Sequence, residues 1–441
     1  MNRKTVWLSI ALVCMLLLSA CGGNQGAGSS EGSNTTGNSV QASGDNKVKL
    51  TFLNSKSEIQ TQLEEAVQVF QSETGIEIEI ITVGNGQSPF EKASQLYASG
   101  NPATILMIDP ADVESFKDRI LELTDEKWVA DAVENSTTVV DGKVLDFPLA
   151  VEGFSFIYNK AVLDEAVGGN FDPASIATRD DLAALFEKIE ATGIKAIHIS
   201  PMDWSLGAHY MNGLYANQSQ DFTEVVQFIE DLKQGKVDVQ SNTVFNGLMD
   251  TFDLMMEYNN MQEQPLSAAY EQGPEDIASG NVGIWFMGNW AWPNIRAFDE
   301  NGEYGFLPVP ISNNPDDYGN TQIATAVTKR LVIDKEKSTA AQQEAAKQFL
   351  NWLVYEESGQ DFLINKANIV PAFNGMKFEA NDPLAKSIQS YMASGKTTVG
   401  MTIMPADHWN NVGASMQKYL AKAGDRKALA SEIEQYWKKV K

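Results

Sequence analysis

The strongest constraint on the fold is a strand, a helix and a second strand that follow one another between residues 48 and 83. Residues 48–53 form an apolar run typical of a strand, and a helix with one apolar stripe is predicted from Ser57 onward. Gly75 is expected to end this helix, because glycine readily takes the left-handed conformation found at helix ends. Residues 76–83 alternate apolar and polar side chains, as a half-buried strand does. Strands joined by a helix lie parallel, so the sequence predicts an α/β fold.

The chain is long enough for two such units. Its 441 residues exceed one ordinary domain and can form two large cores. The alternation continues in a strand at residues 104–108 and resumes with a helix at 179–191 and a strand at 195–200. We therefore expect two lobes, each a sheet flanked by helices.

Polar side chains follow two of the predicted strands. Asn54 and Lys56 come directly after the first strand, and Asp109 follows the strand at residues 104–108. In open parallel sheets, ligands bind beyond the carboxyl ends of the strands. These three residues are candidate ligand-binding residues. The alternatives are a solvated lysine and an aspartate that only forms a turn with Pro110.

Glu152 interrupts an apolar run at residues 147–158. An unpaired charge in a buried strand is costly, so we expect this side chain to face a polar cleft. A purely structural hydrogen-bonding role is the alternative.

Three tryptophans and two glycines fall within residues 283–293. Residues 282–287 are typical of a buried strand, and Gly288-Asn289 of a turn in which Asn289 caps a following helix. This arrangement would hold Trp290 at the mouth of a cleft, where its flat apolar face suits a sugar ring. Trp285, inside the strand, is assigned to the core. The alternative is that all three tryptophans are core residues.

The first twenty residues are typical of a signal sequence. Arg3 and Lys4 precede an apolar run that is too short for a comfortable membrane span. The run ends in LSACG, which resembles the lipobox of bacterial lipoproteins, so cleavage is expected before Cys21 and a lipid on Cys21. An ordinary secretory signal is the alternative. Residues 21–46 are small and polar, which predicts a flexible tether, and Cys21 is the expected contact with the bilayer.

Charge and motifs exclude several function classes. The formal net charge of −25 disfavours nucleic acid as a partner. The mature chain would keep no cysteine for disulfides or metal, and its three histidines lack metal-binding spacing, so we expect no metal and no cofactor. A secreted glycosidase with two carboxylates stays an alternative, although 58 acidic residues make such a pair uninformative.

Several stretches resemble a known family in their order along the chain. They lie at the family's first junction of helix and strand, at its first crossing between lobes and around two sugar-facing tryptophans: 74–78 (TGIEI), 148–152 (PLAVE) with 157–160 (IYNK), 288–295 (GNWAWPNI) with Leu307-Pro308, and 404–409 (MPADHW). From residue 47 to its end the chain resembles the bacterial extracellular solute-binding proteins (family 1) of ABC sugar importers, and among them the maltodextrin binders. Asn289 stands where maltose binders commonly have proline, which leaves the particular sugar open.

The resemblance implies a two-lobed, periplasmic-binding-protein-like (type II) α/β fold. Residues 47–152 and 313–368 would form lobe 1, and residues 153–312 and 369–441 lobe 2. Three crossings, near Glu152, Pro310 and Pro371, would let the lobes close over a ligand.

The resemblance also assigns roles. Sugar hydroxyls would bind Lys56 and Asp109 in lobe 1 and Glu152 at the hinge, and sugar rings would stack on aromatic residues of lobe 2, namely Trp290, Trp409 and, as a looser match, Trp204. The implied protein is not an enzyme. It would be a lipid-anchored monomer on the outer face of the bacterial membrane that passes a carbohydrate to permease subunits. A receptor for a non-sugar solute is a further alternative.

Overall fold

The computed structural model describes residues 48–84, 87–133, 136–400 and 404–440. The expected signal sequence, Cys21 and the tether lie outside these residues. Among the helices in the described ranges, none combines the length and the apolar character that a membrane crossing needs.

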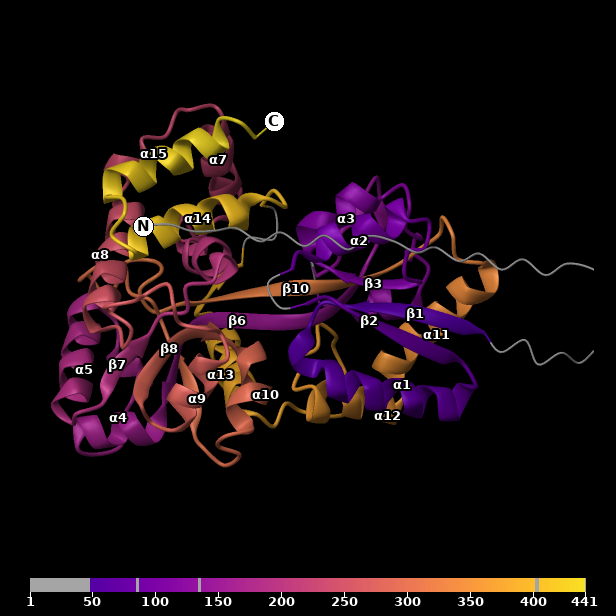
Figure 1. Cartoon of the computed structure of the whole chain (residues 1–441), viewed down its shortest axis with the longest axis horizontal. Helices are drawn as coiled ribbons and strands as arrows, with labels where there is room; N and C mark the ends of the chain where they lie inside the picture. Colours follow the sequence, from indigo (N-terminus) through magenta and orange to yellow (C-terminus); the bar gives the residue numbers. More distant parts are fainter. Residues whose placement is uncertain (1–47, 85–86, 134–135, 401–403, 441) are drawn as a thin grey trace, which may run out of the picture. The chain divides into compact units, whose positions relative to one another are not determined.

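Two long strands, β6 (Phe147–Asn159) and β10 (Ile323–Ile333), run antiparallel through the middle of the sheet (Figure 1). On one side β10 pairs with β3, followed by β1 and β2, and on the other side β6 pairs with β8, followed by β7. In the described residues this gives one nine-stranded sheet, with β9 (Tyr304–Leu307) on β6 and β11 (Thr397–Val399) on β10. The α/β class is as predicted. One sheet runs through both halves because β6 and β10 are long enough to pair with strands of each half.

The first half of the sheet contains the predicted strand, helix and strand. They are β1 (Lys49–Asn54), α1 (Gln60–Thr74) and β2 (Glu77–Thr82), and β1 is parallel to both β2 and β3 (Ile105–Ile108). Gly75 ends α1 in the left-handed conformation, at φ 78°, as predicted. The carboxyl ends of β1 and β3 therefore meet at one edge.

The second half repeats this arrangement. β7 (Lys195–His198) is parallel to β8 (Val282–Gly288). The preceding helix α5 (Arg179–Ala191) begins at Thr178, whose side chain accepts a hydrogen bond from the backbone N–H of Asp181. Such a reciprocal cap fixes the start of a helix.

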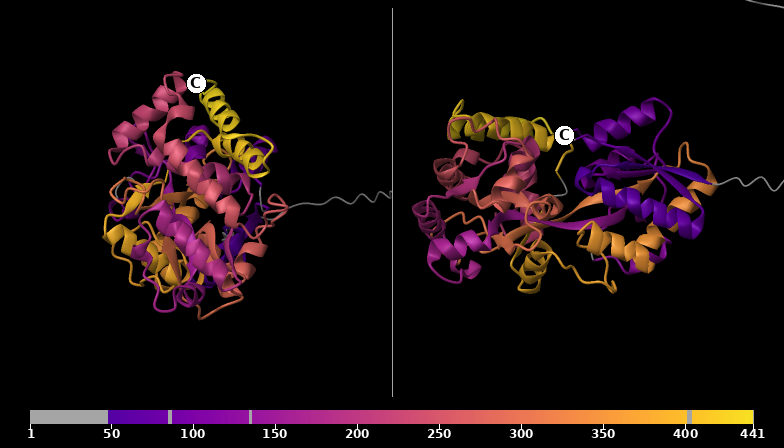
Figure 2. Two further views of the ribbon diagram at one scale, coloured as in Figure 1. Left: turned by 90° about the vertical axis from the view of Figure 1, so that its left-hand side faces the viewer. Right: turned by 60° about the horizontal axis from the view of Figure 1, so that its bottom comes forward.

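Each half has its own hydrophobic core, built partly by segments distant in sequence. In the first, α11 (Ala340–Tyr355) packs its Phe349 against Phe70 of α1, with ring centroids 5.1 Å apart. In the second, α14 (His408–Leu420) and α15 (Arg426–Trp437) return to the same end as α7 (Phe222–Lys233) and α8 (Thr243–Tyr258), as Figures 1 and 2 show. Two cores are what the chain length allows.

The remaining short strands and helices surround the sheet. They are α2 (Pro89–Ala98), α3 (Pro110–Phe116), β4 (Val139–Val140), β5 (Lys143–Val144), α4 (Lys160–Val167), α6 (Asn212–Ala216), α9 (Gln272–Ala278), α10 (Trp292–Arg296), α12 (Glu357–Asp361), α13 (Pro383–Ala393), the 3₁₀ segments η1 (Ser57–Ile59), η2 (Lys127–Ala130), η3 (Pro173–Ser175), η5 (Val239–Ser241) and η6 (Asn289–Ala291), and the π-helical segments η4 (Ser205–Tyr210) and η7 (Phe362–Lys366).

The tryptophan-rich stretch folds differently from the prediction at one residue. Trp285 and Trp292 are core residues and Trp290 is partly exposed. Asn289, however, is not a helix cap, because its side-chain oxygen accepts a hydrogen bond from the backbone N–H of Gly153, 3.0 Å away. β8 pairs with β6 as far as Gly288. The side-chain amide of the next residue, Asn289, therefore lies close to the backbone of β6 and bonds to it instead of capping a helix.

Candidate ligand-binding site

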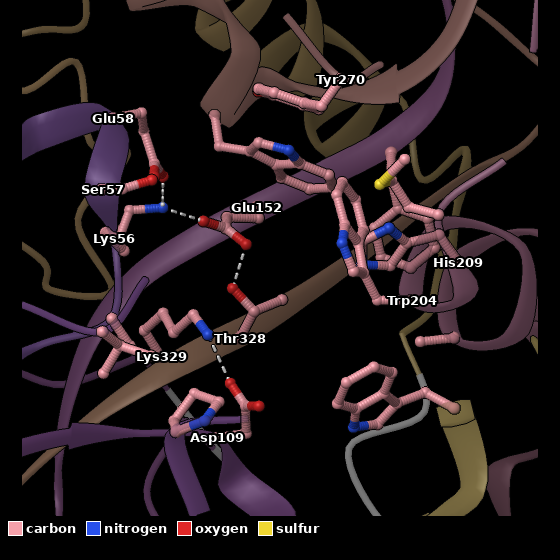
Figure 3. A pocket seen from close by; sticks show the side chains of 18 of the residues that line it. Lys56, Ser57, Glu58, Asp109, Glu152, Trp204, His209, Tyr270, Thr328 and Lys329 are labelled. Atoms are coloured by element: carbon pink, nitrogen blue, oxygen red, sulfur yellow. Dashed lines mark hydrogen bonds and ion pairs between the residues drawn. The ribbon is translucent and has the colours of Figure 1, made fainter. Parts of the chain in front are cut away.

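A cavity of about 900 Å³ lies between the strand ends of the first half and the helices of the second. Its floor is formed by β6 and β10, and charged side chains line one wall and aromatic rings the opposite wall (Figure 3). The volume is of the size that encloses a small organic ligand.

The polar wall begins with a turn after β1. The side-chain oxygen of Asn54 accepts from the backbone N–H of Lys56 at 2.9 Å, and its amide donates to the Lys56 carbonyl at 3.0 Å. The turn directs the Lys56 ammonium to two carboxylates, 2.7 Å from Glu58 and 2.5 Å from Glu152. Asn54 is completely buried and shapes the turn rather than lining the cavity.

Glu152 projects from the middle of β6 and is 5% exposed. Its second oxygen accepts a hydrogen bond from the hydroxyl of Thr328 on β10. Burial is the strongest influence and would raise the pKa of Glu152, but the charge of Lys56 and the hydrogen bonds from Lys56 and Thr328 hold that pKa below its usual value. Glu152 is therefore a charged hydrogen-bond acceptor.

A second ion pair follows β3. Asp109 accepts from the Lys329 ammonium at 2.5 Å, and Asp112, one helical turn further along, is 3% exposed beneath this pair. Burial lowers the pKa of Lys329, but Asp109 outweighs it and the pKa is raised. Burial and then the charge of Asp109 raise the pKa of Asp112 to about 7. The two lysines thus keep their charge, whereas Asp112 sits close to its titration point at neutral pH.

The opposite wall is an aromatic cluster of Phe154, Trp204, His209 and Trp290, with Tyr270 at its edge. The His209 ring lies 4.6 Å from Phe154 and 4.8 Å from Trp290, and the two tryptophans are 6.2 Å apart. Burial lowers the pKa of His209 to about 4, so the ring is neutral at neutral pH and behaves as an aromatic side chain. The cluster forms a rigid apolar surface that faces the carboxylates.

Glycine at position 288 allows Trp290 to lie in this cluster. A Cβ on Gly288 would lie 2.0 Å from the Trp290 indole. The indole therefore folds back over its own backbone, and no residue with a side chain fits at position 288 without moving it.

A close backbone contact between η4 and α14 positions the helix that carries Trp409, the remaining tryptophan of the lining. A Cβ on Gly207 of η4 would lie 2.4 Å from the Trp409 carbonyl oxygen and from the Gly413 nitrogen, both on α14. This glycine seam, Gly207 with Gly413, lets the two helices touch through their backbones. Trp409 lies on α14 and Trp204 immediately precedes η4, so the seam sets how closely the two segments that carry these tryptophans approach.

Comparison with known proteins identifies the family. Residues 65–393 match the family described as bacterial extracellular solute-binding protein, which is well over half of the chain. The chain belongs to this family. The sequence-based assignment is confirmed.

Solved structures share the fold of this solute-binding protein. They include a protein named SBP RafE, in complex with raffinose, with a TM-score of 0.74 and 19% identity over 89% of this chain and 99% of that one. A sugar transporter of Bacillus licheniformis in complex with stachyose has a TM-score of 0.69 and 17% identity over 89% of this chain and all of the other. Both cover the two halves described above, so the two-lobed fold is shown.

A curated relative is described as an uncharacterized ABC transporter extracellular-binding protein of Pyrococcus horikoshii. It is 24% identical over 285 residues. The match takes in 62% of this chain and 58% of the relative, so it spans little more than half of the curated protein.

The structure of this solute-binding protein brings six of the seven sequence-predicted ligand residues into one cavity: Lys56, Asp109, Glu152, Trp204, Trp290 and Trp409. Asn54 is outside it. Lys56 is 4% exposed, which rules out the alternative of a solvated surface lysine. In the part of the chain that the structure describes, no group of three or more metal-ligating side chains is present.

Sequence reasoning missed most of the other lining residues, among them Phe154, His209, Tyr270, Thr328 and Lys329. A signal existed for Lys329, because it stands in the run AVTKRLVI at residues 326–333, and a lysine in a buried strand needs a partner just as Glu152 does. For His209 the signal was its position close to Trp204 after the strand at residues 195–200. Nothing in the sequence pattern separates Tyr270 from an ordinary surface tyrosine.

The glycine seam predicts that one added methyl group at position 207 lowers the stability of the protein. Gly207→Ala is expected to push α14 away from η4 and to destabilise the protein by roughly 1 to 3 kcal/mol, because the added atom meets backbone that cannot rotate aside. Urea unfolding measures the stability, and near-ultraviolet circular dichroism detects the loosened aromatic cluster. The matched control is Gly169→Ala, where a Cβ meets nothing within 4 Å. Equal stability of the two variants would contradict the proposed seam.

Asp112 predicts a pH-dependent stability. Its pKa is about 7 in the fold against a reference value of 3.8, so the protonated form stabilises the protein at low pH and this contribution is lost as the pH rises through 7. The Asp112→Asn side chain cannot ionise, so the variant does not lose this stability. Relative to wild type, its free energy of unfolding is expected to increase by roughly 2 to 4 kcal/mol between about pH 4 and pH 8. Urea unfolding at several pH values measures this difference. Asp118→Asn, at an exposed aspartate, serves as the control, and a pH-independent difference for Asp112→Asn would refute the assignment.

Proposed function

We propose that this protein is the substrate-binding component of an ABC importer and that it captures an oligosaccharide in the cavity. The observation that carries the proposal is the pairing of an aromatic wall with ionised carboxylates across one space of about 900 Å³. The protein would be held at the outer face of the membrane by a lipid on Cys21 and would deliver its ligand to permease subunits.

The two walls match the two kinds of surface on a sugar. A pyranose ring presents apolar C–H faces, which suit the rings of Trp290, Trp204 and Trp409. Its rim presents hydroxyl groups, which donate to Glu152 and Asp109. Hydrogen bonds to charged acceptors are stronger than neutral ones, each contributing about 1.5 to 3 kcal/mol.

The proposed lobes are residues 47–152 with 313–368 and residues 153–312 with 369–441. Three segments connect them, and two lie side by side where Val151 of β6 donates its N–H to the Val370 carbonyl at 2.7 Å. A ligand that contacts both walls binds the closed arrangement better than the open one and shifts the equilibrium towards closure. The closed form would be the one that the permease recognises.

The relatives support this assignment. RafE was solved with raffinose and the Bacillus licheniformis transporter with stachyose, and the archaeal relative is described as an ABC transporter binding protein. We propose that the protein acts as a monomer. The lowered pKa of Glu152 suits a hydrogen-bond acceptor and not the general acid of a glycosidase.

Binding without turnover is the central expectation. Titration with neutral oligosaccharides should quench tryptophan fluorescence saturably, and prolonged incubation should release no product. Trp290→Ala and Trp409→Ala are each expected to weaken binding roughly 10- to 100-fold, because each removes one stacking surface. Phe222→Ala, at an exposed residue outside the cavity, should bind as wild type does. Product formation would favour a glycosidase, and binding unchanged in both tryptophan variants would overturn the proposed site.

The anchor is tested separately. Cys21→Ala, expressed in a bacterium, should move the protein from the membrane fraction to the soluble extracellular or periplasmic fraction, since the cysteine is the proposed site of acylation. Radioactive palmitate should label the wild-type chain and not the variant. Membrane retention of the unlabelled variant would disprove this mode of attachment while leaving sugar binding untouched.

A further inference from the structure

The charges of the cavity limit the sugars that it accepts, an inference that rests on the proposed function. Among the described residues that line the cavity there are two cations, Lys56 and Lys329, and no arginine. Five carboxylates line the same space: Glu58, Asp109, Asp112, Glu152 and Glu271. Even without Asp112, whose pKa of about 7 leaves it only partly charged at neutral pH, the carboxylates of the lining outnumber the two lysines.

Both cations are already engaged by protein carboxylates. The Lys56 ammonium lies 2.7 Å from Glu58 and 2.5 Å from Glu152, with its side chain 5% exposed. The Lys329 ammonium lies 2.5 Å from Asp109. Figure 3 shows both ammonium groups turned towards these carboxylates. A ligand anion that approached either lysine would meet a protein carboxylate already beside it.

An anionic sugar would also bring its charge close to the protein's own carboxylates. Uronates, sulfates and phosphates are bound in proteins by free lysines or by bidentate arginines. Here the carboxylates outnumber the cations, and juxtaposed like charges disfavour binding strongly. The net charge of the whole chain, −25, adds a repulsive field at longer range.

A sugar hydroxyl, in contrast to an anionic group, can donate a hydrogen bond to these carboxylates. The Thr328 hydroxyl already donates to Glu152 at the cavity floor, which shows that this carboxylate accepts a neutral O–H while paired with Lys56. A sugar hydroxyl makes the same kind of bond without adding charge.

We propose that the cavity selects uncharged oligosaccharides and rejects those that carry carboxylate, sulfate or phosphate groups, because its two lysines are internally paired and its carboxylates are in excess.

A panel of oligosaccharides tests the inference on the wild-type protein. Calorimetry would compare raffinose, stachyose, maltotriose, xylotriose and triacetylchitotriose with trigalacturonic acid and sialyllactose. We expect at least one neutral sugar to bind and each anionic sugar to bind at least ~100-fold more weakly than the best neutral one. An anionic sugar that binds as tightly as the best neutral one overturns the charge selection and leaves the proposed function standing. If no sugar binds, the proposed function fails and this inference fails with it.

A matched pair of ligands isolates the charge from the shape. One ring of the best neutral binder is oxidised at its primary hydroxyl, and the product is compared with its primary amide, at a ring where the amide is tolerated. The wild-type protein should prefer the amide by at least ~10-fold, because the two ligands have nearly the same shape and only the carboxylate carries a charge. Equal binding of amide and carboxylate overturns the inference.

Two variants assign the effect to the Lys329 pair. In Asp109→Asn/Asp112→Asn, Lys329 loses its carboxylate partner and can pair with a ligand carboxylate instead, so the preference for the amide should fall at least ~10-fold. Asp118→Asn/Asp125→Asn removes two exposed charges outside the cavity and should keep the wild-type preference. An equal fall in both variants would show that net charge and not the lysine pairing decides, and would overturn the inference. Circular dichroism confirms folding, and the wild-type comparison decides alone if the first variant does not fold.

Discussion

A carboxylate buried in a strand stays ionised only where a cation reaches it, and the pair of Glu152 and Lys56 imposes this condition on the whole site. In the sheet, β3 and β10 separate β1, which precedes Lys56, from β6, which carries Glu152. Lys56 must therefore reach past the ends of β3 and β10 to meet Glu152. The two hydrogen bonds between Asn54 and the Lys56 backbone hold the turn that makes this possible. A buried ion pair contributes little net stability because both charges lose their hydration. What this pair supplies is a charged acceptor at a fixed place in the cavity floor.

The aromatic wall depends on a different constraint, which is the space between backbones. Gly288 allows an indole to lie over its own turn, and the glycine seam allows η4 to touch α14. In both places a side chain would occupy the space that now positions a tryptophan. Packing in this manner removes rotamer freedom from the rings before any ligand arrives. A ligand that stacks on them then loses less of its binding free energy to ordering the protein.

Much of the fold could be predicted, because it depends on local patterns. The alternation at residues 48–83 predicted β1, α1 and β2, and Gly75 predicted the end of α1. The site was partly predictable, since strand ends and a charge within an apolar run point to clefts. Contacts between distant segments were not. Asn289 accepts from Gly153, and Lys329 meets Asp109, 220 residues away, because of sheet pairing that no local window contains. The position of Asn54 beyond the strand predicts a ligand residue. Its side chain instead bonds to the backbone of the local turn and lies outside the cavity.

The two walls present different surfaces to a ligand, and under the proposed charge selection this difference would let one cavity combine affinity with selectivity. Stacking on the rings depends on shape and on apolar area, which many hexose and pentose chains share. The charged wall would distinguish neutral sugars from anionic ones. Its lysines pair with Glu152 and Asp109 without help from the ligand, so a sugar hydroxyl can donate to Glu152 as a charged acceptor, whereas a ligand anion would meet lysines that already have carboxylate partners. Discrimination built in this way relies on repulsion as much as on attraction. It also requires the lysines to stay paired in the empty site, which is the arrangement that the structure shows.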